Sequence, residues 1–371
     1  MIESPPLWMW VIGFLLVLGP LVTLHELGHY LVGRWFGVQA TAFSVGFGKE
    51  LAGYTDRRGT RWKLSALPLG GYVQFAGDMN PASQPSDEWL ALPAEERART
   101  FQARTLWQKA LIVAAGPVTN FAVAIAILAG LNLAYGRVEV PPVVQVLAED
   151  GAAAQAGVAL GDRIVSLNGE PIEQFEEVRG FVAPYPDEPV TLVVDRGGRQ
   201  LTYRFTIRSV EEQDRFGNRF RIGQIGVGSG DGQLVPVQPA ESVVLAVRQT
   251  GEIVETMVIG LWQVISGRRS VEELGGPIKI AKFSGEQLSL GWPQFIHFAA
   301  LISINLAFIN LLPIPALDGG HLAFYAAEAI RRRPASQRSQ EWAFRTGIAL
   351  VLALMLFVTI NDVATLPIWG R

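Results

Sequence analysis

The stretch LVTLHELGHYLV, residues 21–32, places two histidines and a glutamate in the middle of an apolar segment that runs from about Leu7 to Phe36. That segment is longer than the roughly 20 apolar residues that a helix needs to cross a bilayer. A charged or polar side chain costs several kcal/mol in hydrocarbon unless it is paired, so such residues are rarely placed there without a function. The stretch therefore predicts a membrane helix that carries a polar functional site.

The composition of the 371-residue chain is typical of an integral membrane protein, because 49% of the residues are apolar and the mean hydropathy is +0.26. The formal net charge of −3 and the absence of a basic block argue against a nucleic-acid partner. The chain has no cysteine, which excludes disulfides, thiolate zinc sites, cysteine nucleophiles and iron–sulfur clusters. Any metal must therefore be bound by histidine and carboxylate side chains.

Four apolar segments are long enough to span a bilayer, so the lipid bilayer is an expected partner. They lie near Leu7–Phe36, Leu106–Tyr135, Pro293–Leu312 and Trp342–Leu366. Lys and Arg gather in the loops after the first and third segments, and the positive-inside rule therefore predicts that these loops are cytoplasmic. The region between the second and third segments then lies on the other side, which is the periplasm in a Gram-negative cell.

A soluble insert, residues 137–210, has the element order of a small α+β domain. It contains AGVALGDRIVSLNG with a tight turn at Asn168-Gly169, a short helix in FEEVRGFV, and two strands joined through Gly197-Gly198. This order resembles a bacterial PDZ domain, whose groove accepts an extended C-terminal peptide as an added strand. The alternative is a spacer domain with no ligand.

The rest of the chain divides into three parts around this insert. Residues 1–136 and 293–371 form the N-terminal and C-terminal membrane parts, and residues 211–292 form an extracytoplasmic strand and amphipathic-helix region. The helix predicted over Glu241–Ile265 carries charged residues among its apolar positions, which indicates that it lies on or beside the membrane. A fifth spanning helix is the alternative.

His25 and His29 are four residues apart on the first predicted helix, so both imidazoles project from one face and can bind one metal ion. With Glu26 they form the pattern HExxH, in which the glutamate takes a proton from a water that zinc (Zn2+) activates. The alternative is a structural pair of histidines that bond across a helical bundle. A catalytic zinc site needs a third protein ligand.

The third ligand is expected in NLAFINLLPIPALDGGHLAFY, residues 305–325, where Asp318 follows the third apolar segment. Two prolines there cannot continue the helix, and Gly319-Gly320 allows a close approach to another backbone. A helix broken at membrane depth is tolerated only where it is buried in protein or lines a wet cavity. His321, three residues beyond Asp318, is a rival ligand on chemistry alone.

HELGH in the first segment together with NLLPIPALDGG late in the chain resembles the site-2 protease family of intramembrane zinc metalloproteases. The single PDZ-like insert is similar to that of the regulator-of-sigma-E protease branch, although the better-known members carry two. The resemblance covers nearly the whole chain. It implies that His25, His29 and Asp318 bind zinc, that Glu26 is the catalytic base, and that Asn310 lies near the substrate.

The resemblance also gives a role to two Gly-punctuated strand patterns, SVGFGKEL and WKLSALPLGGYVQFAG. It implies that these strands fold back and pair with an unwound substrate, with the substrate-binding glycines Gly46, Gly48, Gly70 and Gly71. The alternative is an ordinary amphipathic hairpin at the membrane surface. Asn120, in AAGPVTNF, matches a further motif of the family to which no chemical step is assigned.

The sequence thus predicts an α-helical integral membrane protein of about four transmembrane helices, with a membrane-associated β-hairpin region and an inserted α+β PDZ-like domain. The resemblance implies a zinc endopeptidase of the bacterial inner membrane, with the PDZ-like domain periplasmic and the active site open toward the cytoplasm. Its expected partner is a single-pass membrane protein, such as a pre-cleaved anti-sigma factor or a remnant signal peptide, cut in regulated intramembrane proteolysis.

Two other functions remain open at this stage. One is a catalytically silent membrane adaptor that binds C-termini through the PDZ-like domain. The other is an integral HExxH metalloprotease of the prenyl-protein or quality-control type, which takes its third zinc ligand from a downstream glutamate rather than from an aspartate.

Overall fold

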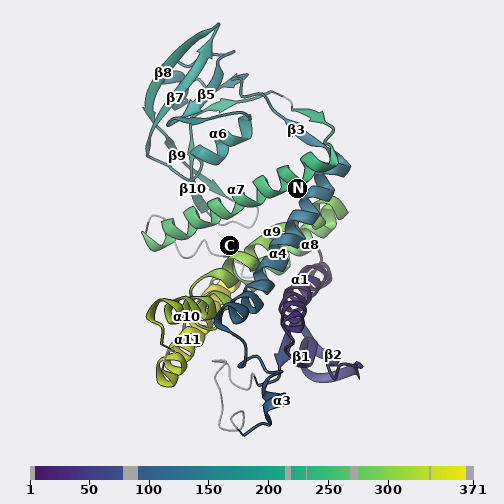
Figure 1. Cartoon of the computed structure of the whole chain (residues 1–371). Coiled ribbons are helices and arrows are strands. Elements are labelled where there is room, and N and C mark those ends of the chain that lie inside the picture. Colours follow the sequence, from purple (N-terminus) through teal and green to yellow (C-terminus); the bar gives the residue numbers. More distant parts are fainter. Residues whose placement is uncertain are drawn as a thin grey trace. The chain divides into compact units, whose positions relative to one another are not determined.

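The computed structural model describes residues 5–77, 91–213, 219–230, 232–267, 275–333 and 336–364, which form two compact units (Figure 1). The first unit comprises Met1–Leu131, Val243–Val254 and Gly275–Val363. The second comprises Asn132–Ser242, Glu255–Leu274 and Ala364–Arg371. The first unit holds the apolar helices and a long hairpin, and the second holds a β-rich domain.

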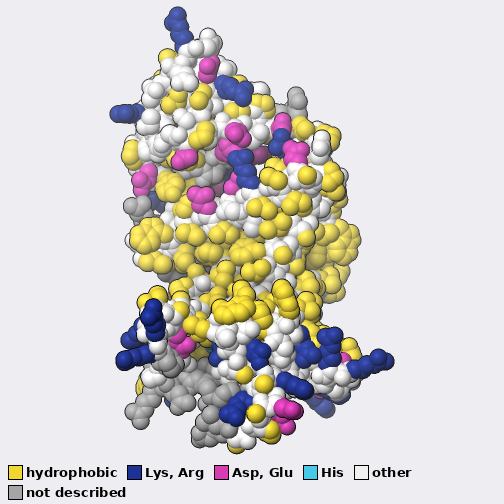
Figure 2. Space-filling model, viewed as in Figure 1, with side chains coloured by type: hydrophobic (Ala, Val, Ile, Leu, Met, Phe, Trp, Pro, Cys, Tyr) yellow, Lys and Arg dark blue, Asp and Glu magenta, His cyan; other side chains and the backbone are white. Residues whose placement is uncertain are grey.

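Four helices are long and apolar enough to cross a membrane, as predicted. They are α1 (Leu7–Trp35), α4 (Leu106–Tyr135), α9 (Trp292–Leu311) and α11 (Gln337–Ala364). The last begins five residues before the predicted Trp342, and residues 365–366 of the prediction lie outside the described part. Figure 2 shows the hydrophobic side chains of this unit as a band, with Lys and Arg gathered at the end formed by the hairpin and by α10 and α11. The predicted fold class is confirmed.

The hairpin consists of β1 (Ala40–Thr55) and β2 (Arg61–Phe75), which pair antiparallel. Its inner face is held to α1 by a cluster of buried aromatic and aliphatic side chains, Tyr30, Val38, Phe43, Phe75, Phe101 and Ile112. The pairing register shifts around Gly46 and Gly48, which have φ angles of +91° and +87°. Because L side chains rarely adopt such angles, these two glycines bend the hairpin at this point.

An additional helix, α8 (Pro277–Leu290), packs against α1 in the first unit. A Cβ atom on Gly13 would lie 2.8 Å from the backbone of Ser284, and one on Gly285 would lie 2.8 Å from the backbone nitrogen of Trp10. Small residues of this kind allow helix backbones to approach closely within a membrane. The last segment of the helical unit therefore begins at Gly275, before the predicted boundary between residues 292 and 293.

The chain turns back sharply between α9 and α10 (Asp318–Arg331). A Cβ atom on Gly319 would lie 2.3 Å from the carbonyl oxygens of Leu311 and Leu312, and one on Gly320 would lie 2.4 Å from that of Ile314. This confirms the predicted close approach of the Gly-Gly pair to another backbone. The turn places Asp318 at the first position of α10.

The second unit is built on a four-stranded antiparallel sheet in the order β6-β5-β7-β8. The sheet and the helices beside it are β5 (Arg163–Leu167), β6 (Glu170–Pro171), α6 (Phe175–Val182), β7 (Pro189–Arg196), β8 (Arg199–Thr206) and α5 (Ala152–Ala156). The predicted turns at Asn168-Gly169 and Gly197-Gly198 are confirmed, since all four residues have positive φ angles. The core holds Ile164, Leu167 and Leu192 from the sheet with Val178 and Val182 from α6.

The domain extends beyond the predicted boundary at residue 210. β11 (Val227–Gly228) pairs with β4 (Val146–Leu147), and Ile225 belongs to the same core. The remaining short elements are α3 (Ala94–Arg97), β3 (Arg137–Glu139), β9 (Arg208–Gln213), β10 (Arg219–Gln224) and β12 (Gln233–Val235). Part of the strand region that was predicted to be separate therefore completes the domain, because β11 finds its partner β4 about eighty residues earlier in the chain.

The amphipathic helix α7 (Pro239–Ile265) begins two residues before the predicted Glu241 and ends where predicted. It exposes large apolar side chains, of which Val244 is 68% and Trp262 is 65% exposed. It is not among the four described helices that are long and apolar enough to span a membrane. The structure therefore gives no support for a fifth span here, and the placement of this helix on or beside the membrane stays a prediction.

We expect the Asp162→Ala substitution to destabilise the β-rich domain by about 1–2 kcal/mol, because the buried carboxylate of Asp162 accepts hydrogen bonds from Arg196 and from the backbone N–H of Ala159. The bond from Arg196 lowers the pKa of Asp162. The stabilisation is therefore complete above the unfolded-state pKa of about 3.9 and is lost as the pH falls through the lower folded-state value.

Amide hydrogen exchange in β5 and β7 of the full-length protein measures the loss of stability caused by Asp162→Ala. The matched control is Asp150→Ala, which breaks an ion pair with Arg208. The side chain of Asp150 is 80% exposed and that of Arg208 is 58% exposed. Because solvent screens such a pair, little change is expected. Equal effects of the two substitutions would contradict the assignment of a stabilising role to the buried carboxylate of Asp162.

Candidate active site

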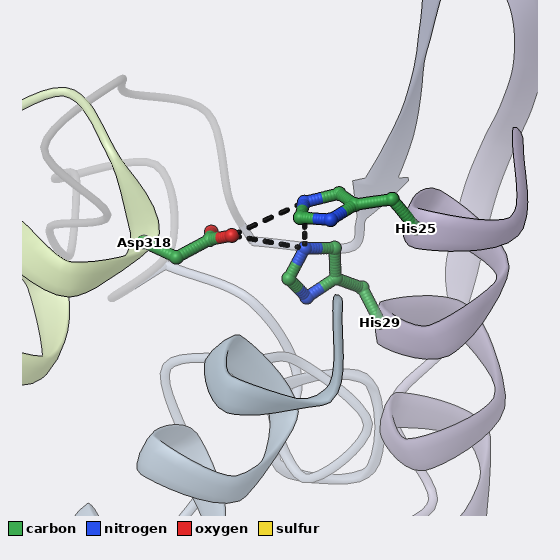
Figure 3. A group of neighbouring side chains, drawn as sticks. All are labelled: His25, His29 and Asp318. Atoms are coloured by element: carbon green, nitrogen blue, oxygen red, sulfur yellow. Dashed lines mark hydrogen bonds and ion pairs between the residues drawn. The ribbon is translucent and has the colours of Figure 1, made fainter. Parts of the chain in front are cut away.

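Two histidines and an aspartate converge on one point in the helical unit (Figure 3). His25 and His29 come from successive turns of α1, and Asp318 comes from the first turn of α10. The two Nε2 atoms are 3.2 Å apart, and Oδ2 of Asp318 lies 3.1 Å from Nε2 of His25 and 3.6 Å from Nε2 of His29. Ligand atoms around a tetrahedral zinc ion, with bonds of 2.0–2.1 Å, are about 3.3 Å apart. The three side chains therefore fit a zinc ion.

The hydrogen bond on the far side of His29 supports this fit. The Nδ1–H group of His29 donates to the backbone carbonyl oxygen of Ile112, at 2.8 Å. The proton is thereby held on Nδ1, and the lone pair on Nε2 points at the other two ligand atoms. Oδ2 of Asp318 is buried and accepts no hydrogen bond from the described residues. Electron pairs that face one another in a buried site need a cation between them.

Two glycines allow α1 and α4 to cross closely enough to form this arrangement. A Cβ atom on Gly28 would lie 2.3 Å from Oγ1 of Thr119 and 2.5 Å from the carbonyl oxygen of Ala115. A Cβ atom on Gly116 would lie 2.2 Å from Nε2 of His29 and 2.7 Å from Nε2 of His25. Sequence reasoning missed both roles, although small residues within apolar helices are a known signal of close helix crossing.

Glu26 lies beside the histidines and is held by the hairpin. The backbone N–H of Val73, in β2, donates to Oε2 of Glu26 at 3.0 Å. Glu26 lines a cavity of about 450 Å³ that also contains the three converging side chains. The base predicted from HExxH and the three predicted ligands thus share one cavity.

The other predicted site residues divide into two groups. Asn310, Gly70 and Gly71 line the cavity, whereas Gly46 and Gly48 are not among its described lining residues. His321 also lines the cavity, but it is not part of the described group whose ligand atoms all lie within 4.8 Å of one another.

The arrangement has the parts that hydrolysis of an amide requires. Two imidazoles and one carboxylate leave one position of a tetrahedral metal ion for water, and a carboxylate in the same cavity can accept the proton of that water. The helices around the cavity are apolar enough to lie in a bilayer. Hydrolytic chemistry at membrane depth is therefore within the capacity of this site.

Comparison with known proteins agrees with this chemistry. The model of peptidase family M50 matches residues 13–354. A protein of Agrobacterium fabrum with the name "Putative zinc metalloprotease" is 46% identical over 362 residues, which cover 96% of each chain. One of Rhizobium meliloti, named in the same way, is 46% identical over 355 residues, or 94% of this chain and 95% of the relative. "Metalloprotease MmpA" of Caulobacter vibrioides is 35% identical over 382 residues, which cover 95% of this chain and 94% of the relative.

Among solved structures, the PDZ domain of an SdrC-like protein from Listeria monocytogenes matches 24% of this chain and 84% of its own. The identity is 17% and the TM-score is 0.19. A likeness this slight adds nothing to the strand pairings described above.

We expect Gly116→Ala to lower the zinc content of the purified protein at least tenfold, because the added methyl group would occupy the space beside both Nε2 atoms. Zinc is measured by mass spectrometry after dialysis against a weak chelator. Gly130→Ala is the matched control on the same helix, since a Cβ atom there meets nothing within 4 Å. Full zinc content in Gly116→Ala would contradict the claim that the space beside the two Nε2 atoms must stay free for zinc to bind.

Proposed function

The chain belongs to peptidase family M50, the site-2 protease family, and on that premise we propose that it cleaves the transmembrane segments of single-pass membrane proteins. It is a zinc metalloprotease with four apolar helices, a multi-pass membrane protein. The substrates within this class are pre-cleaved anti-sigma factors or remnant signal peptides, processed in regulated intramembrane proteolysis. The observation that carries the proposal is the convergence of His25, His29 and Asp318 with Glu26 in one cavity among apolar helices.

The zinc ligands in this proposal are His25, His29 and Asp318. Their ligand atoms are separated by 3.1–3.6 Å, which suits a tetrahedral ion. His321 lines the same cavity without joining the group and is assigned to the surroundings of the site. The third ligand is thus an aspartate, which separates this chain from metalloproteases that use a downstream glutamate.

Glu26 is the general base and then the general acid. Zinc held by these ligands would lower the pKa of a water molecule and polarise the scissile carbonyl group. The backbone N–H of Val73 holds Oε2 of Glu26, and we assign the proton transfer to Oε1. Glu26 accepts the proton of the attacking water and delivers it to the nitrogen of the leaving amine. An adaptor without catalytic activity has no need for a carboxylate in this position.

The substrate enters the cavity as an extended chain beside β2. Gly70 and Gly71 line the cavity that contains Glu26. A Cβ atom on Gly70 would lie 2.5 Å from the ring of Phe47, and one on Gly71 would lie 2.6 Å from the carbonyl oxygen of Ser44, so both glycines let β2 approach β1 closely. A strand edge holds an extended peptide through backbone hydrogen bonds, which a protease needs because a helical segment hides its amide groups. Asn310 lies in the same lining and is placed to contact the substrate. Gly46 and Gly48 contribute by bending the hairpin.

The protein lies in the bacterial inner membrane, with the active site open toward the cytoplasm and the PDZ-like domain in the periplasm. The support for this orientation is the concentration of Lys and Arg in the segment between α1 and α4 and in the segment that follows α10. The PDZ-like domain then meets the shortened extracytoplasmic end of a substrate and binds its new C-terminus or excludes longer chains.

The test of activity is cleavage of a pre-truncated single-pass substrate by the protein reconstituted in lipid vesicles. We expect Glu26→Gln to lower the rate about 10²–10⁴-fold, because the amide cannot accept the proton. Zinc content of the variant serves as the control and should equal that of the wild type. Equal cleavage by both proteins would rule out Glu26 as the base.

The test of the ligand set compares Asp318→Ala with His321→Ala. Removal of a zinc ligand leaves two histidines, so we expect Asp318→Ala to lose most of its zinc while His321→Ala keeps it. Zinc content is measured together with thermal unfolding, so that loss of the fold is recognised. Loss of zinc in His321→Ala alone would make His321 the third ligand.

A further inference from the structure

We propose that Asn120 is a positioning residue for the metal site, and that its side-chain oxygen Oδ1 accepts the Nδ1–H group of His25 when His25 binds zinc. This inference rests on the proposed function in one respect, since it takes His25 as a zinc ligand. It concerns a residue to which neither the HExxH pattern nor the Asp318 segment assigns any role.

The carboxamide of Asn120 lies against the imidazole of His25. Its side chain is fully buried at 0% exposure, and its amide nitrogen Nδ2 lies 3.2 Å from Nδ1 of His25. The other amide atom, Oδ1, is buried and has no hydrogen-bond partner among the described residues. Rotation of the carboxamide by half a turn exchanges the two atoms, which have nearly the same size.

The orientation of the carboxamide decides which nitrogen of the His25 ring carries the proton. If Nδ2 faces His25, the amide donates to a lone pair on Nδ1, and the proton of a neutral ring is then on Nε2, which cannot bind a metal. If Oδ1 faces His25, the proton is held on Nδ1 and the lone pair on Nε2 is directed at His29 and Asp318. Only the second orientation is compatible with a loaded site.

Residues of α4 contact both histidines in a similar way. His29 donates from Nδ1 to the carbonyl oxygen of Ile112, and Gly116 lies directly beside both rings. Ile112, Gly116 and Asn120 are spaced by four residues, so they lie on one face of α4. That face supplies an acceptor for each imidazole and a gap between them. The acceptor for His25 is a side chain and can therefore be changed by mutation, whereas the acceptor for His29 is backbone.

A purely structural role for Asn120 has a clear basis and must be separated from this one. The hydroxyl group of Ser303, in α9, donates to the backbone carbonyl oxygen of Asn120 at 2.8 Å, and Ser303 is also fully buried. This contact joins α4 and α9 without involving the carboxamide. Ser303→Ala is therefore a matched control for loss of helix packing at the same residue.

The test is the zinc affinity of four proteins in detergent, measured by competition with a chromophoric chelator: wild type, Asn120→Asp, Asn120→Leu and Ser303→Ala. Asn120→Leu keeps the shape of the side chain but has no acceptor, so we expect its affinity to fall 10–100-fold. Asn120→Asp is an acceptor through either oxygen and should bind within about threefold of the wild type or more tightly. Ser303→Ala should bind like the wild type. Unfolding of the metal-free proteins identifies any variant that fails to fold.

Three results would overturn the inference: wild-type affinity in Asn120→Leu, equal losses in Asn120→Asp and Asn120→Leu, or a loss in Ser303→Ala as large as that in Asn120→Leu. All affinities are measured without substrate and depend on no cleavage step, so a failure of the proteolysis assay leaves them unaffected. His25→Ala is the reference variant. If it binds zinc like the wild type, the ligand set itself fails, and this inference fails with it.

Discussion

The structure depends on three potential ligand atoms that converge inside a bundle of apolar helices. Nε2 of His25, Nε2 of His29 and Oδ2 of Asp318 are all within 3.6 Å of their neighbours in the group. Such a convergence is unfavourable in hydrocarbon unless a cation lies within it. Metal binding and helix assembly are therefore linked, because the ligands come from helices far apart in the sequence. The close crossing of α1 and α4 at glycine and the sharp turn before α10 are the means by which the chain brings the three atoms together.

Features that depend on neighbouring residues could be predicted from the sequence. The four spans follow from lengths of apolar sequence, the pairing of His25 with His29 follows from the helical repeat, and the Asn168-Gly169 turn follows from the backbone freedom of those two residues. The place of Asp318 needed the family resemblance in addition, since spacing alone left His321 as a rival.

Features that depend on contacts across the fold could not be predicted in this way. α8 is too short and too polar to register as a membrane element, and only its packing against Gly13 of α1 places it among the helices. β11 is two residues long and acquires its identity from β4, about eighty residues earlier. The groups of α4 that contact the two imidazoles are the backbone carbonyl group of Ile112 and the carboxamide of Asn120. The first has no sequence pattern of its own, and the family motif that contains Asn120 does not show which side chain Asn120 contacts.

The bond from the backbone of Val73 to Glu26 ties the carboxylate of the proposed base to the register of a β-strand. Because alternate residues of a strand face opposite sides, adding or deleting one residue between Gly71 and Val73 would turn a different amide toward Glu26. The tip of the turn between β1 and β2, residues 57–59, is exposed and lies outside this constraint, so it can change in length as surface turns generally can. Insertions and deletions in related chains should therefore occur in that turn and not in the strand beside the carboxylate. The hairpin can then differ in length at its turn, while the part of β2 from Gly71 to Val73 keeps a fixed length.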